Sequence, residues 1–213
     1  DTSSTFGGGE IDLNAGGAVT INGELDVKSD DTEGDGGDIF VQAGGDIHVT
    51  QPMTAKGGGN AGGGTITLLS GGNLTVDEAL DVSGGELDGG DVDLEAQGSL
   101  TVGVKGDMDI SGASLSGSGG SVELDAFTGN LSMSGDVLGT SGGSVEEGGG
   151  FAGTFDAAAP LGSLTLLGTL TFVGGDGGGG GDGGDVTLIA GGPLTVNANI
   201  DCDGGKDTTT QGF

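Results

Sequence analysis

Two glycine-rich acidic segments contain the side chains whose chemistry is easiest to identify. Residues 29–38 read SDDTEGDGGD, and residues 201–207 read DCDGGKD. Carboxylates on loops that glycine allows to bend sharply are typical Ca²⁺ ligands. Calcium is therefore the one cofactor that the sequence suggests, and its candidate ligands are Asp30, Asp31, Glu33, Asp35, Asp201, Asp203 and Asp207.

A solvated acidic surface is the alternative interpretation of these segments. Neither the calcium-binding nonapeptide GGxGxDxUx nor a complete EF-hand loop occurs in the chain. A third segment of the same composition, residues 174–185, has the same two interpretations. Composition alone leaves both open.

Residues that could carry out catalysis are scarce. The chain contains one His, one Cys and no Trp or Tyr, and its four basic residues are all lysines. His48 falls on the outward phase of an expected strand. Cys202 falls on an inward phase, where we interpret it as a core residue that has no second cysteine for a disulfide. We therefore expect no enzymatic activity; a polysaccharide-active enzyme with paired carboxylates is the less favoured alternative.

The charge of the chain excludes some classes of binding partner. Its 33 acidic residues against 4 basic residues give a formal net charge of −29 at pH 7. Nucleic acid is excluded as a partner because phosphate binding needs basic side chains. No apolar run is long enough to cross a bilayer, so we expect no membrane insertion. The remaining partners are divalent cations, surface glycans and further copies of the chain.

An internal repeat predicts the elements that must position these residues. Residues 63–85, GGTITLLSGGNLTVDEALDVSGG, recur with the same alternation at 8–29 and 183–205. Alternation over a few residues predicts half-buried strands, and a period of this length predicts a repeat fold. We predict an all-β parallel β-helix (β-solenoid) of about seven three-stranded coils in one domain, residues 8–205. Its coils start near residues 8, 36, 63, 89, 119, 153 and 183.

Stacked coils would align equivalent residues in inward columns. A β-sandwich also uses short alternating strands, but it does not require one residue class at one phase in every repeat. We expect the Gly–Gly pairs to form corners in which glycine adopts positive φ. The clearest apolar columns are Leu13, Val41, Leu68, Leu94, Leu124 and Leu188; Val19, Ile47, Leu74, Leu100, Leu131, Leu164 and Leu194; and Leu25, Met53, Leu80, Met108, Val137, Leu170 and Ile200.

Two N-x-S/T sequons occupy the same phase of the repeat. Asn73 and Asn130 both fall at the corner before a second strand. A corner is an exposed position, so both asparagines are candidate glycosylation sites in a host that glycosylates proteins.

The repeat pattern, I-x-L-x-A-G-G-x-L-T-V, resembles the repeats of filamentous-haemagglutinin-type adhesins and related secreted bacterial β-solenoids. The resemblance covers about residues 8–205. It implies a secreted or surface-displayed rod that serves in adhesion or scaffolding, and hence an extracellular or cell-surface location.

The ends of the repeat predict head-to-tail assembly. Only short arms, residues 1–7 and 206–213, flank the repeat, and neither reads as a capping helix. Open solenoid ends expose strand edges that another copy can extend. We therefore predict a structural subunit of an extracellular fibre, joined through Phe6, Ile11, Ile200 and Phe213. The alternatives are a monomeric adhesin, a cation-binding surface module and a fragment of a longer adhesin.

Overall fold

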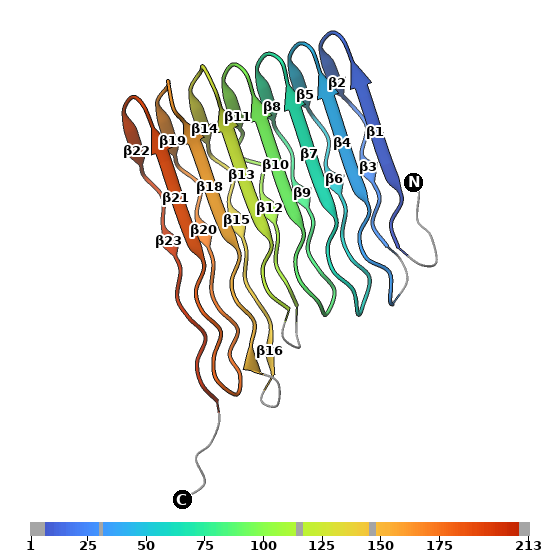
Figure 1. Ribbon diagram of the computed structural model, residues 1–213, viewed down its shortest axis with the longest axis vertical. Helices are drawn as coiled ribbons and strands as arrows, with labels where there is room; N and C mark the ends of the chain where they lie inside the picture. The colour runs from blue at the N-terminus through green and yellow to red at the C-terminus, as the bar shows by residue number, and fades with distance from the viewer. Residues whose placement is uncertain (1–6, 30–31, 114–116, 145–147, 209–213) are drawn as a thin grey trace, which may run out of the picture.

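The computed structural model describes residues 7–29, 32–113, 117–144 and 148–208, which form an all-β parallel β-solenoid (Figure 1). About seven coils, each with three strands, stack side by side, and the described residues include no helix. This confirms the predicted fold class. Adjacent parallel strands lie about 4.8 Å apart, so seven coils extend over roughly 34 Å.

Three seven-stranded parallel sheets form the three sides of the solenoid. The first sheet contains β1 (Glu10–Ala15), β4 (Asp38–Ala43), β7 (Thr65–Ser70), β10 (Asp91–Ala96), β13 (Ser121–Ala126), β18 (Thr154–Ala159) and β21 (Asp185–Ala190). The second contains β2 (Val19–Ile21), β5 (Ile47–Val49), β8 (Leu74–Val76), β11 (Leu100–Val102), β14 (Leu131–Met133), β19 (Leu164–Leu166) and β22 (Leu194–Val196). The third contains β3 (Leu25–Asp26), β6 (Met53–Thr54), β9 (Leu80–Asp81), β12 (Met108–Asp109), β15 (Val137–Leu138), β20 (Leu170–Thr171) and β23 (Ile200–Asp201).

The register between coils confirms the predicted columns. Leu74 pairs with Ile47 on one side and with Leu100 on the other, and the same one-to-one pairing continues along each sheet. Backbone bonds extend the ladder, as in Leu74 N–H to Ser99 O at 3.0 Å. In coil 6 the first column contains Ala157, which pairs with both Leu124 and Leu188.

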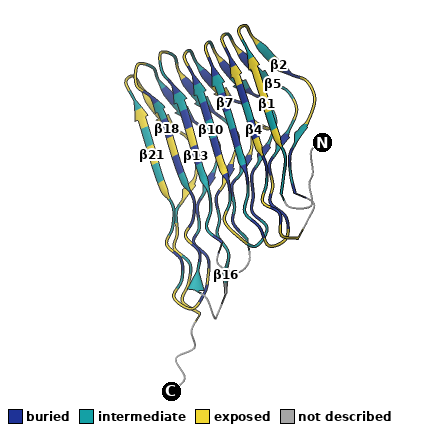
Figure 2. Cartoon of the chain, turned by 45° about the vertical axis from the view of Figure 1, so that its right-hand side comes forward, coloured by how far each residue is buried: buried dark blue, intermediate teal, exposed yellow. Residues whose placement is uncertain are grey.

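The core is a single apolar cluster that runs along the axis of the solenoid. Buried and more exposed residues alternate along the long first-sheet strands of the inner coils (Figure 2). The inward leucines of the inner coils, such as Leu68 and Leu94, are fully buried. Each such side chain contributes about 1.5–3 kcal/mol by leaving water. The short strands are therefore stable only because their neighbours in adjacent coils complete the core.

Glycine has a different role at the corners from the one predicted. The described glycines with positive φ are Gly7, Gly148, Gly179 and Gly180, and none belongs to a Gly–Gly corner between a first and a second strand. The expectation of positive φ at those corners was therefore wrong. At other positions glycine is required because the backbones of adjacent coils approach closely. A Cβ on Gly90, for example, would overlap the carbonyl oxygen of Gly64 in the preceding coil.

One coil is extended by a small hairpin. Strands β16 (Gly143–Ser144) and β17 (Gly148–Gly149) pair antiparallel, in contrast to the three parallel sheets. The hairpin lies at the end of the coils away from the Gly–Gly corners, where β16 is labelled in Figure 1. Residues 145–147 lie outside the described part of the chain.

A glycine and a phenylalanine in adjacent coils complement each other in the core. Gly139 faces Phe172 in the inward column that follows the third strand, since Gly139 N–H bonds to Thr171 O. A Cβ on Gly139 would overlap the Phe172 ring and come within 3.2 Å of Ile110 Cδ1. The ring of Phe172 also packs against Phe155, with centroids 6.4 Å apart. The missing side chain in one coil thus accommodates the largest one in the next.

Replacing Gly139 with alanine tests this complementarity. We expect Gly139→Ala to lower the free energy of unfolding by roughly 1–3 kcal/mol, because the added methyl overpacks the core. Chemical denaturation of the wild type, G139A, F172L and the double variant measures it. In the F172L background the G139A penalty should shrink, and an unchanged penalty would contradict the assignment.

Candidate functional site

Aspartates on the third sheet form turns. Asp26, Asp81 and Asp109 each accept, through Oδ1, the backbone N–H two residues later at 3.0 Å. Asp201 accepts the Asp203 N–H in the same way at 3.2 Å. These are Asx turns, which let a side chain bend the backbone. The outward carboxylates of this column therefore have a structural role at the end of the third strand.

Side-chain oxygens at the corner before the second strand connect successive coils. Asp46 Oδ1 accepts the Asn73 N–H at 2.7 Å, and Asn73 Oδ1 accepts the Ser99 N–H at 2.9 Å. Ser99 Oγ then accepts the Asn130 N–H at 3.1 Å, and Asn130 Oδ1 accepts the Ser163 N–H at 2.9 Å. We call these five residues the corner ladder. Its four bonds connect five consecutive coils and satisfy corner N–H groups in four of them.

Both sequon asparagines belong to the corner ladder. Asn73 and Asn130 are exposed, and the amide oxygen of each is already bound to the next coil. A glycan would attach to the amide nitrogen, and Asn73 Nδ2 has a long contact of 3.4 Å to Asp46 Oδ1. Glycosylation at these positions stays a prediction.

A groove of about 530 Å³ lies on the outer face of the third sheet, over strands β9, β12, β15 and β20. Its lining includes Asp107, whose Oδ1 accepts the Asp136 N–H at 2.9 Å. Asp136 in turn accepts the Thr169 N–H at 2.6 Å. Half-exposed Leu138 supplies an apolar surface beside these carboxylates. The groove therefore presents oriented carboxylates next to an apolar patch, a combination that suits hydroxyl-rich or cationic groups.

Five carboxylates gather on the outer face of the first sheet. In register, Asp93 pairs with Glu123 and Glu95 pairs with Asp125. Asp156 pairs with Glu123 on the other side. We call these five residues the carboxylate cluster. Like charges this close repel one another, so the cluster destabilises its own sheet face when fully ionised.

Asp93 is the most perturbed member of the carboxylate cluster. Its Oδ1 atom is buried and has no hydrogen-bond partner. Burial, reinforced by Glu95, Glu123 and Asp125, raises the pKa of Asp93 to about 6. The pKa of Asp125 is also raised, by burial and by Glu95 and Asp156. Asp93 and Asp125 thus hold protons more tightly than isolated carboxyls do.

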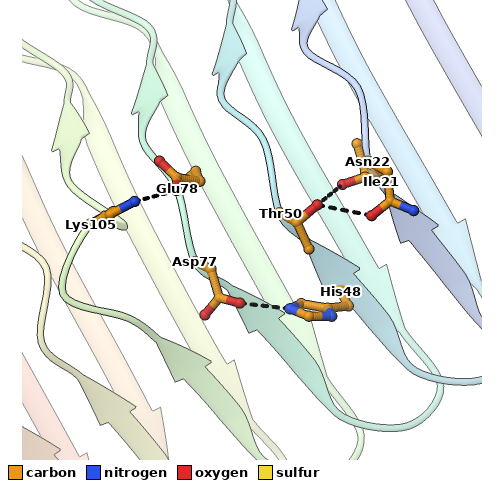
Figure 3. Close-up of polar contacts among 7 residues, drawn as sticks. All are labelled: Ile21, Asn22, His48, Thr50, Asp77, Glu78 and Lys105. Atoms are coloured by element: carbon orange, nitrogen blue, oxygen red, sulfur yellow. Dashed lines mark hydrogen bonds and ion pairs between the residues drawn. The ribbon is translucent and has the colours of Figure 1, made fainter.

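Polar contacts between neighbouring coils surround His48 (Figure 3). His48 Nε2 lies 2.6 Å from Asp77 Oδ2, and both side chains are about half exposed. Lys105 Nζ donates to Glu78 Oε1 at 2.9 Å. The Thr50 hydroxyl lies 2.9 Å from the carbonyl oxygen of Ile21 and from Oδ1 of Asn22. His48 lies on the outward phase of β5, as expected, and is half exposed; its contact with Asp77 was not foreseen.

The calcium candidates divide between the two ends of the solenoid. Asp35 lies just before β4, where its Oδ1 accepts the Gly62 N–H at 2.9 Å, and exposed Glu33 lies nearby in sequence. Asp201 and Asp203 belong to the last coil, and Asp207 forms a bridge with Gly177. Within the described ranges, no group of three His, Cys, Asp or Glu residues is arranged to hold a metal ion. Asp30 and Asp31 lie outside these ranges, and calcium binding stays a prediction.

Two of the predicted assembly residues, Ile11 and Ile200, lie on the edge coils. Ile11 is part of β1, and Ile200 begins β23 with 41% of its surface exposed. Phe6 and Phe213 lie outside the described residues. Cys202 is partly buried and packs against the core, as expected, and burial together with Asp201, Asp185 and Asp203 raises the pKa of its thiol.

Comparison with known proteins adds no family to this picture: no family model, curated protein or solved structure matches the chain. Among the described residues there is also no helix with the length and apolar character to cross a membrane.

The carboxylate cluster predicts that acid stabilises the fold. The folded-state pKa of Asp93, about 6, exceeds the ordinary value of 3.8, so the folded chain binds this proton more tightly than the unfolded chain does. Stability should rise as the pH falls from 7 to about 4. At pH 7, Asp93→Asn should stabilise the fold by about 1–2 kcal/mol, after allowance for solvent screening of this half-exposed group.

Urea unfolding at pH 7.5 and pH 4.5 measures both effects. Asp12→Asn is the matched control, because Asp12 stands in the same outward column but on the edge strand β1. D93N should flatten the pH dependence more than D12N does. Equal pH dependence in the two variants would show that the cluster does not act as described.

Proposed function

We propose that this chain is a structural subunit of an extracellular or cell-surface fibre, which assembles head to tail through its edge coils. The observation that carries the proposal is the exposure of inward apolar residues in the last coil. Leu194 and Ile200 are 49% and 41% exposed, whereas Leu164 and Leu170, their partners in the preceding coil, are at most 1% exposed.

Both edge coils present surfaces that an inner coil would cover. In the first coil, Leu13 is 37% exposed, although its partner Val41 is fully buried. Among the residues that the structure describes, β1 and β21 each have one neighbour in the first sheet, so the outer edge of each strand has no strand partner within the described part of the chain. Open strand edges of this kind accept another strand, and exposed apolar area adds to the driving force.

The geometry of the two edges favours a linear polymer. The surface on β21, β22 and β23 differs from the surface on β1, β2 and β3, and continuing the parallel stack of the solenoid joins one surface to the other. A contact between two different surfaces propagates as a filament unless its rotation closes a ring. In this proposal the high negative charge keeps single filaments apart, since like-charged rods repel. The role assigned to the chain is structural rather than catalytic.

A surface-binding module is the second candidate function. The groove over β9, β12, β15 and β20 favours it, because its oriented carboxylates beside Leu138 suit a surface glycan or a divalent cation. Such a module could be a monomeric adhesin or a section of a longer adhesin. In the longer adhesin, further coils of the same polypeptide would cover the exposed residues of the edge coils.

A charge placed on the exposed apolar column should block assembly. We expect Leu194→Glu to raise the critical concentration for polymerisation at least roughly tenfold, because burial of a leucine is worth about 1.5–3 kcal/mol. Sedimentation velocity over a concentration series measures this for the wild type and the variant.

Leu138→Glu is the matched control. Leu138 has a similar exposure of 41%, but it points outward from β15, in the middle of the stack. L138E should polymerise like the wild type and should lose ligand binding if the groove is a binding site. A wild-type chain that remains monomeric at all concentrations would refute the fibre proposal and leave the surface-binding module.

A further inference from the structure

We infer that the last coil of one copy receives the first coil of the next copy in the same residue-to-residue register that stacks coils within the chain. Leu188, Leu194 and Ile200 would then pair with Leu13, Val19 and Leu25 of a second copy. This inference rests on the proposed function, because it specifies the joint through which the subunits would assemble.

The spacing of the strands supports this register. From Val186 to Leu194 is eight residues and from Leu194 to Ile200 is six. The first coil has the same spacing, eight residues from Ile11 to Val19 and six from there to Leu25. The two edge coils are therefore matched at both corners, and all three sheets can continue across the joint without an insertion.

Coils elsewhere in the chain show that this match is not automatic. The fifth coil has nine residues from Val122 to Leu131, one more than the edge coils. The fourth has eight from Leu100 to Met108, two more than the edge coils. The second and third coils have the same spacing as the edge coils, so the last coil matches each of the first three coils.

The side chains on the two edges also fit. Within the chain, leucine pairs with valine or isoleucine in the inward columns, as in Val137 with Leu170 and Leu170 with Ile200. The inferred joint repeats such pairs and sets Ala190 against Ala15 beside the corner. On the outer face of the second sheet it sets Thr195 against Thr20, and threonine pairs with threonine in the same way between β8 and β11.

One charge contact gives the joint its polarity. Lys28 pairs with Lys56 of the next coil, as the bond from Ser29 N–H to Lys56 O shows. At the same position of the repeat, Val173 pairs with Asp203 of the last coil, as the bond from Gly174 N–H to Asp203 O shows. Continuing this pairing places Asp203 of one copy beside Lys28 of the next. Lys28 Nζ already lies 2.9 Å from Asp26 Oδ2.

Two carboxylate pairs oppose the same joint. The register sets Asp185 against Glu10 and Asp201 against Asp26. Lys28 would lie among Asp26, Asp201 and Asp203 and offset part of this repulsion. The joint should therefore depend strongly on this single lysine.

Cross-linking tests the register directly. In a Cys202→Ala background, Thr20→Cys and Thr195→Cys would lie about 4.8 Å apart across the joint. Both threonines are exposed and point outward, so the substitutions should leave the core intact. A short bis-maleimide should convert the assembled protein into a covalent ladder on a denaturing gel. The control pairs Thr20→Cys with Thr187→Cys, an equally exposed residue that the register places opposite Asp12 instead.

The outcomes separate the register from assembly itself. A ladder from T20C/T195C and none from T20C/T187C supports the inference. Filaments by electron microscopy without a T20C/T195C ladder, or with a T20C/T187C ladder, would overturn the register and leave the proposed function standing. Neither filaments nor a ladder would refute both.

A charge variant tests the polarity. Lys28→Ala should raise the critical concentration severalfold, whereas Lys105→Ala should not, although each variant removes one positive charge. Lys105 is the control because it pairs with Glu78 in the middle of the stack. Equal effects of the two variants would contradict the role of Lys28.

Discussion

Stacking of parallel coils at about 4.8 Å is the constraint on which the rest of this structure depends. It makes the neighbour of each residue the equivalent residue one coil away, so a leucine such as Leu74 contacts Ile47 and Leu100. The same spacing requires glycine where backbones approach closely, as at Gly90. No coil can form a core alone, because each depends on the coils beside it.

The acidic surface serves this stacking in one region and opposes it in another. Along the corner ladder, and at Asp107 and Asp136, side-chain oxygens accept backbone N–H groups of the next coil and hold coils together. In the carboxylate cluster, Asp93 and its neighbours repel one another across adjacent strands, and burial raises the pKa of Asp93 to about 6. Acid should therefore strengthen the first sheet.

The fold could be predicted from the sequence because the alternation within each strand and the repeat of whole coils indicate the same structure. Alternation predicted which side chains face inward, and the repeat predicted which ones stack, so columns such as Leu68 with Leu94 were correct. Contacts that depend on side-chain geometry in the next coil were not predictable, as with His48 and Asp77 or Gly139 and Phe172. Positive φ, the role predicted for glycine at the corners, was also wrong, because the close approach between coils cannot be recognised in the sequence of a single repeat. We predicted Asp201 as a calcium ligand. The structure also shows it in an Asx turn with Asp203, which the spacing of these two aspartates could have indicated.

Electron microscopy of the purified protein at neutral pH, with and without Ca²⁺, tests most directly whether the edge coils stack as the inner coils do. The account predicts filaments one solenoid wide, with an axial repeat on the order of 34 Å, which corresponds to seven coils at the parallel-strand spacing. Dispersed short rods in both conditions would contradict it.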